Sequence, residues 1–127
     1  MFRAYSTHKT SFLTDEIIIF SNATVNTGSG YSTTTGKFTA TIDGRYLFVK
    51  QICMRAGYNG YTAFVHNNNI ILKSNTGSSV WSCASAQTFL QLSKGDQVWV
   101  KDTYGSSSFV QDQTDGTTYF AGVLMSN

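Results

Sequence analysis

A two-residue alternation of side chains runs from Lys37 to Met54 and constrains the fold more than any other feature of the sequence. In an extended strand, successive side chains point to opposite sides. The segment KFTATI therefore places Phe38, Ala40 and Ile42 on one side. The segment RYLFVKQICM places Tyr46, Phe48, Lys50 and Ile52 on one side and Leu47, Val49, Gln51 and Cys53 on the other. No window shows the 3.6-residue period of a capped helix, so the chain is predicted to be all-β.

Turn signals separate the predicted strands. They are TTTG (33–36), DG (43–44), GYNG (57–60), NNN (67–69), NTG (75–77), KGD (94–96), YGSSS (104–108) and DQTDG (112–116). Two further alternating segments, TFLQL and DQVWV, place Leu90, Leu92, Val98 and Val100 inward. Short strands with turns about every 8–12 residues predict a sandwich or a jelly roll. No linker or repeat interrupts the chain, so residues 1–127 are predicted to form one domain.

The composition excludes several classes of protein. Hydrophobic residues make up 41% of the chain and charged residues 13%, which is typical of a globular protein. Nine Lys and Arg residues stand against seven Asp and Glu, and the basic residues occur singly. A nucleic-acid partner normally needs a concentrated basic patch, so none is expected. No apolar run approaches the roughly 18–20 residues of a membrane helix, so no membrane insertion is expected, and no leader peptide is visible.

Strands that are apolar on both sides predict self-association. If only the Tyr46 and Phe48 side met the core, Leu47 and Val49 would be left in water. Phe89 would likewise be left in water, because it points to the other side of its strand from Leu90. A two-layer sandwich has no third layer to cover such a face, so a partner chain is the better explanation.

Catalytic chemistry finds little support in the sequence. His8 and His66 belong to no nucleophile motif, and Asp15 and Glu16 are adjacent, so on a strand they point to opposite sides. A phosphate loop must open a helix, whereas the GSG segment at 28–30 leads into another strand. The protein is therefore not expected to be an enzyme.

Two sets of polar and aromatic residues are candidates for binding. Asp112 and Asp115, with Asp102 from a nearby strand end, could hold calcium through their carboxylates, although a solvated turn is the simpler interpretation. Loop aromatics can stack on sugar rings, and basic residues can pair with glycan carboxylates or sulfates. The candidates are Tyr58, Tyr61, Trp81 and Tyr104, with Arg55 and Lys73. The alternative is that Trp81 and Tyr61 pack beneath their own loops.

An ordered series of residues resembles a known family. It begins with Phe2, Arg3 and Ala4 and with IIIF ending at Phe20. It continues through NTGSGYSTTTGKFTATIDGRYLF, with Asn26, Gly28, Tyr31, Gly36, Phe38, Gly44, Tyr46 and Phe48. It ends with LQLSKGDQVWV (90–100) and YFAGVLM (119–125). Over essentially all 127 residues the chain resembles the globular C1q-domain family, relatives of the tumour necrosis factor ligands, and especially its stalkless invertebrate members. Thr41 stands where the family usually has a proline.

The resemblance implies a ten-stranded jelly-roll sandwich that assembles as a compact homotrimer, with one sheet facing the three-fold axis. Leu47, Val49 and Phe89 are then the expected trimer contacts. The two cysteines fit neither a zinc site nor a CxxC motif. In the implied topology the strands of Cys53 and Cys83 are neighbours, so a disulfide is possible, and two buried free thiols are the alternative.

The resemblance also implies a function. It suggests a secreted, extracellular recognition protein without catalysis, lectin-like and acting in innate immunity, whose partners are glycans or microbial surface polysaccharides. Asn22, in the triplet NAT, is a possible N-glycosylation site. Two alternatives stay open: a cytokine-like ligand for a protein receptor, and a structural trimerisation module of a larger chain.

Overall fold

The computed structural model describes residues 1–111 and 117–127. In these residues the chain forms eleven strands and one short 3-10 turn, Thr27–Ser29. The strands are β1 (Phe2–Thr7), β2 (Ser11–Phe12), β3 (Phe20–Asn26), β4 (Phe38–Thr39), β5 (Gly44–Met54), β6 (Asn59–His66), β7 (Asn69–Gly77), β8 (Ser82–Leu92), β9 (Gln97–Asp102), β10 (Ser106–Ser107) and β11 (Tyr119–Ser126). The all-β prediction is confirmed. No helix in the described residues is long and apolar enough to cross a membrane.

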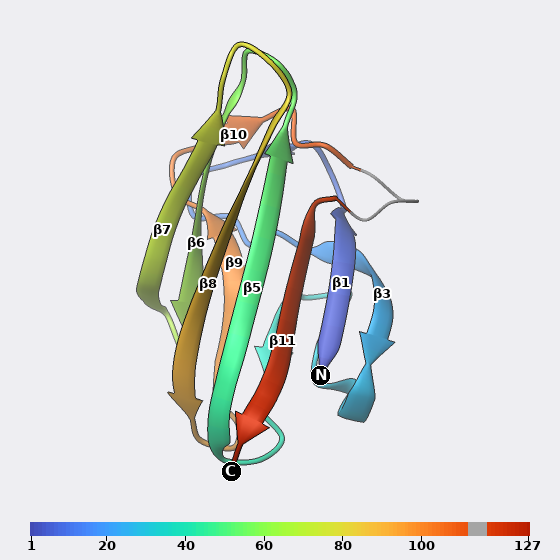
Figure 1. Cartoon of the computed structure of the whole chain (residues 1–127), viewed down its shortest axis with the longest axis vertical. Coiled ribbons are helices and arrows are strands. Elements are labelled where there is room, and N and C mark those ends of the chain that lie inside the picture. The colour runs from blue at the N-terminus through green and yellow to red at the C-terminus, as the bar shows by residue number, and fades with distance from the viewer. Residues whose placement is uncertain (112–116) are drawn as a thin grey trace.

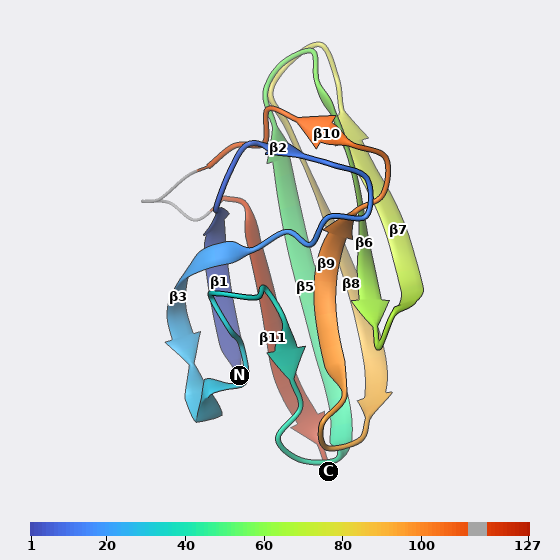
Figure 2. The same cartoon turned by 180° about the vertical axis from the view of Figure 1, so that it is seen from behind.

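The strands form two antiparallel sheets that lie face to face (Figures 1 and 2). The first has five strands in the order β3-β1-β11-β5-β8, and the second has four in the order β4-β9-β6-β7. β2 and β10 pair with each other across one end of the sandwich. Neighbours within a sheet are mostly distant in sequence, which is the arrangement of a jelly roll. Both termini lie at one end, and the loops β5–β6 and β7–β8 project from the other (Figure 1).

The side chains of β5 and β8 alternate between the core and the outer face, as the sequence predicts. On β5, Tyr46 and Phe48 are buried between the sheets, whereas Leu47 and Val49 are half-buried on the outer face. On β8, Leu90 packs against the core and Phe89 is 68% exposed on the outer face. The five-stranded sheet therefore presents an apolar outer face to solvent.

Aromatic rings fill the space between the sheets. Phe2 stacks on Tyr31 with ring centroids 4.9 Å apart and on Phe38 at 5.1 Å, and it meets Phe120 edge to face at 4.9 Å. Gly122 makes this packing possible, because a Cβ atom there would come within 2.6 Å of the Phe2 ring. The segment 26–48 thus supplies four rings to the core, which are those of Tyr31, Phe38, Tyr46 and Phe48.

One sequence expectation is wrong in detail. The alternation predicts Ile42 on the same side as Phe38 and Ala40, which are buried, but β4 ends at Thr39 and Ile42 is 41% exposed. The chain turns there towards β5, and the Tyr46 hydroxyl donates a hydrogen bond to the Ile42 carbonyl at 2.8 Å. The alternation is interrupted because a turn has no two-residue period.

Cys53 and Cys83 are joined by a disulfide, with an S–S distance of 2.03 Å. They are directly opposite each other in the antiparallel register of β5 and β8. Of the two states that the sequence left open, the structure has the bonded one. The bond joins the end of β5 to the beginning of β8, next to the β5–β6 and β7–β8 loops.

Lys50 is a charged residue that lies in the mainly apolar interior. Alternation along β5 directs it inward with Phe48 and Ile52, and it is 1% exposed. Its Nζ donates hydrogen bonds to Thr62 Oγ1, at 2.6 Å, and to Ser74 Oγ, and lies 5.3 Å from the centre of the Phe64 ring. Removal from water lowers the pKa of Lys50 from an ordinary 10.5 to about 8.

Candidate functional site

The three predicted trimer contacts lie on the outer face of the five-stranded sheet. Leu47 lies directly opposite Val123 of β11 on one side and Phe89 of β8 on the other, so the three side chains form one row. Val49 lies opposite Ala121 in a second row. A hollow of about 130 Å³ is lined mainly by apolar residues, including Leu47, Val49, Ala121 and Val123. The structure thus gathers the three predicted trimer contacts on one face.

Residues of β11 belong to this face although sequence reasoning did not select them. Alternation in YFAGVLM places Ala121, Val123 and Met125 together, and Met125 is 56% exposed beside Phe89. The same two-residue rule that was applied to β5 would have found them. The end of the face nearest the disulfide is more polar and carries Tyr5 and Tyr119.

Asn22, the possible glycosylation site, lies at the edge of the same sheet. It is on β3, directly opposite Tyr5 of β1, and is half-buried. Directly opposed residues share a face, so Asn22 is on the outer side, at the end of the row that contains Tyr5 and Tyr119. Its modification stays a prediction.

Three predicted ligand-binding residues lie in the projecting loops. Arg55 and Tyr58 are in the β5–β6 loop and Trp81 ends the β7–β8 loop. The loops are joined by a hydrogen bond from the Gly57 amide to the Ser78 carbonyl, at 2.9 Å. Tyr58 is 47% exposed and Trp81 is 55% exposed. Trp81 therefore does not pack beneath its own loop.

Tyr61, on β6 of the four-stranded sheet, and Tyr104, in the turn after β9, form a separate group. Their ring centroids are 5.3 Å apart, with an angle of 60° between the planes. Tyr104 is 74% exposed, and Tyr61 is half-buried. The Thr103 amide donates to the Tyr61 carbonyl at 2.9 Å and holds the turn that carries Tyr104.

Of the three predicted calcium ligands, the structure describes only Asp102. Asp102 is completely buried, and its Oδ1 accepts hydrogen bonds from the Tyr104 amide, at 2.9 Å, and the Gly105 amide, at 2.5 Å. Its other oxygen, Oδ2, has no hydrogen-bond partner in the described residues. Asp112 and Asp115 lie outside those residues. Within residues 1–111 and 117–127, no three His, Cys, Asp or Glu side chains are grouped as a metal site would require. Calcium binding stays a prediction.

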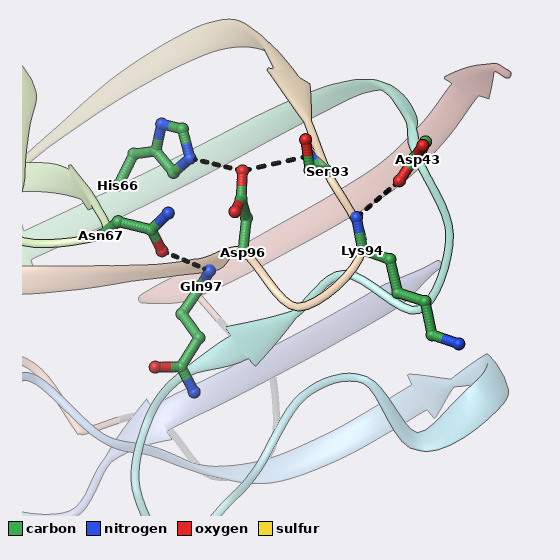
Figure 3. Close-up of polar contacts among 7 residues, drawn as sticks. All are labelled: Asp43, His66, Asn67, Ser93, Lys94, Asp96 and Gln97. Atoms are coloured by element: carbon green, nitrogen blue, oxygen red, sulfur yellow. Dashed lines mark hydrogen bonds and ion pairs between the residues drawn. The ribbon is translucent and has the colours of Figure 1, made fainter.

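A polar network joins three turns at the end of the molecule that holds the termini (Figure 3). His66 Nε2 lies 3.0 Å from Asp96 Oδ2, which also accepts the Ser93 amide hydrogen at 3.0 Å. Both contacts lower the pKa of Asp96, and the hydrogen bond from the Ser93 amide has a larger effect than the contact with His66. Asp43 Oδ1 accepts from the Lys94 amide at 2.7 Å.

Sequence reasoning missed this network. Thirty residues separate His66 from Asp96, and no local pattern links them. A second contact, from the Gln97 amide to Asn67 Oδ1 at 2.8 Å, joins the same two turns.

Comparison with known proteins identifies relatives along most of the chain. A family model described as the C1q domain matches residues 1–125. Human complement C1q tumor necrosis factor-related protein 3 is 30% identical over 118 residues, which cover 85% of this chain and 44% of that protein. Zebrafish caprin-2 is 32% identical over 100 residues, which cover 73% of this chain and 11% of that protein. The chain thus spans less than half the length of these relatives.

Solved structures show the same fold. The globular domain of zebrafish complement 1qA protein has a TM-score of 0.77 and 19% identity, and the match covers 99% of this chain and 98% of that chain. Eiger TNF from S. frugiperda has a TM-score of 0.77 and 14% identity, with 99% and 92% covered. Murine APRIL has a TM-score of 0.74 and 10% identity, with 98% and 97% covered. At such identities the likeness establishes the jelly-roll fold alone.

Proposed function

This chain belongs to the C1q-domain family, and we propose that it is a secreted recognition protein without catalytic activity that works as a homotrimer. Members of this family are recognition or signalling proteins and not enzymes. The observation that carries the proposal is the apolar outer face of the five-stranded sheet, with Phe89 68% exposed. Three copies that pack these faces around an axis would remove the apolar surface from water.

The proposed ligand is a glycan, such as a polysaccharide of a microbial surface, and the proposed role is lectin-like recognition in innate immunity. Exposed aromatic side chains support it, because Tyr58, Trp81 and Tyr104 offer flat apolar faces to sugar rings. Arg55 and Tyr61 complete the proposed contact set. Three weak sites on one rigid trimer can raise apparent affinity by about 10²–10⁴-fold.

A cytokine-like ligand for a protein receptor is the second candidate. The structural likeness to Eiger TNF and murine APRIL favours it as much as the likeness to complement 1qA favours a lectin. A trimerisation module of a longer protein is the third, and the greater length of the relatives favours that alternative.

A glycan array and a pull-down of intact bacteria, each with and without EDTA, test the lectin proposal. We expect retention on a subset of glycans, and EDTA reduces it if the carboxylates of Asp102, Asp112 and Asp115 hold calcium. Absence of binding in both assays would overturn the glycan proposal. Binding to animal cells that persists after glycosidase treatment would favour the protein receptor.

A further inference from the structure

The outer side of the four-stranded sheet brings together residues that are far apart in the sequence. On β6, Thr62 and Phe64 are buried on one side, so Tyr61 and Ala63 point to the other. In the register with β7, Asn75 lies directly opposite Tyr61 and Lys73 directly opposite Ala63. Opposed residues share a face, and β6 lies between β7 and β9 (Figure 2). Tyr61, Lys73, Asn75 and Tyr104 are called the tyrosine face below.

The two tyrosines provide a prearranged apolar surface. Tyr104 is 74% exposed, and its ring meets that of Tyr61 at a centroid distance of 5.3 Å. The turn that carries Tyr104 is held from beneath by the buried carboxylate of Asp102. A ligand that packs on these rings would not have to order the loop first, and preorganisation of this kind favours binding.

The tyrosine face carries a positive charge that no carboxylate in the described residues pairs with. Lys73 is exposed and makes no ion pair with any other described residue. Lys101, which flanks Ala63 on the β9 side, is already paired with Asp15 at 2.8 Å. The carboxylate of Asp102 is buried and accepts amide hydrogens. The tyrosine face therefore offers one uncompensated ammonium group, and the Asn75 amide beside it can donate and accept hydrogen bonds.

We propose that the tyrosine face binds an acidic glycan. A sugar ring packs on Tyr104, its carboxylate or sulfate pairs with the Lys73 ammonium, and a hydroxyl bonds to the Asn75 amide. The inference rests on the proposed glycan recognition and narrows it to an anionic sugar at one face of the molecule. A neutral sugar would leave the Lys73 charge without a partner.

Titration calorimetry with short soluble oligosaccharides tests the site without avidity. The probes are an oligogalacturonate with carboxylates only, a sulfated dextran oligosaccharide with sulfates only, and the unsulfated dextran oligosaccharide. We expect at least one acidic probe to bind and the neutral probe not to bind. Lys73→Gln and Tyr104→Ser should each weaken that binding about tenfold. Lys94→Gln removes the same charge from an exposed turn outside this face and should change affinity less than about twofold.

Each contrary result identifies what has failed. Equal losses in Lys73→Gln and Lys94→Gln would mean general electrostatic attraction and would overturn the site. Binding of the neutral dextran alone, or acidic binding that neither tyrosine-face variant alters, would also overturn it while leaving glycan recognition standing. No binding to these probes or to any arrayed glycan would overturn the proposed function itself. Circular dichroism of each variant separates lost contacts from lost folding.

Discussion

At the scale of single residues, strand alternation places Lys50 where burial of its charge costs free energy. Alternation along β5 directs its side chain inward, where its Nζ contacts hydroxyl groups and a ring. The buried carboxylate of Asp102 lies opposite Thr62 in the register of β6 and β9, but no ion pair joins it to Lys50. Burial penalises the charged form of Lys50, which is why its pKa is lowered to about 8. The hydroxyls of Thr62 and Ser74 accept two of the three hydrogen bonds that the ammonium can donate, but they do not neutralise its charge.

The stability of the fold should therefore rise with pH in the alkaline range. The pKa of Lys50 is lower in the folded state than in the unfolded one, so the contribution of Lys50 to stability is complete above about pH 10.5, is lost as the pH falls towards about 8, and does not change below that. The difference corresponds to about 3 kcal/mol. In urea unfolding at fixed protein concentration, Lys50→Met should raise the free energy of unfolding at pH 7 and abolish this dependence. Lys94→Met is the matched exposed control, and a wild-type profile that stays flat from pH 7 to 10 would contradict the prediction.

At the scale of elements, side-chain hydrogen bonds add to backbone ones in holding the turns at the terminal end. Asp96 in the β8–β9 turn binds both the Ser93 amide and His66 at the end of β6. Asp43 of the β4–β5 turn caps the Lys94 amide. Carboxylate oxygens thus satisfy amide groups that the sheets leave unpaired, and they tie the two sheets together at this end (Figure 3).

Asp96→Asn should lower the midpoint of thermal unfolding at pH 7, because the amide keeps the shape but loses the charge that the Ser93 amide and His66 stabilise. The pKa of Asp96 is lowered in the folded state, so its contribution is present above the ordinary value of 3.8 and disappears as the pH falls through the folded pKa. Melting curves of both proteins should converge in acid. Asp15→Asn, at another ion pair, is the control. A gap between the curves that persists at the lowest pH would disprove the electrostatic explanation.

At the scale of the whole molecule, the exposed apolar face predicts assembly. Light scattering should give about three times the 14.0 kDa mass of one chain at micromolar concentration. Val49→Asp and Phe89→Asp should each reduce that mass, because a charge buried between subunits would have no partner. Leu13→Asp adds the same charge at a residue that is 75% exposed between β2 and β3 and should leave the mass unchanged. A monomeric wild type would refute the trimer, and a full-size trimer in both variants would show that another face forms the contact.

The sequence by itself determined the fold class and which side of β5 and of the end of β8 faces the core. The two-residue period is local, so Phe48 could be assigned inward and Leu47, Val49 and Phe89 outward without knowledge of any neighbour. Where the period stops, as at Ile42, the local rule failed. The ordered anchor residues then indicated the family, which the match over residues 1–125 confirms.

Only the tertiary structure decided which distant residues meet. The register of β5 and β8 places Cys53 against Cys83, and the register of β6 and β7 places Lys73 and Asn75 beside the tyrosines. The end of β9 buries Asp102, which the sequence suggests as a possible calcium ligand at a strand end. His66 reaches Asp96 only because two turns meet at one end of the sandwich. In an antiparallel sandwich these contacts depend on strand order and register, which join segments far apart in the chain and leave no local pattern.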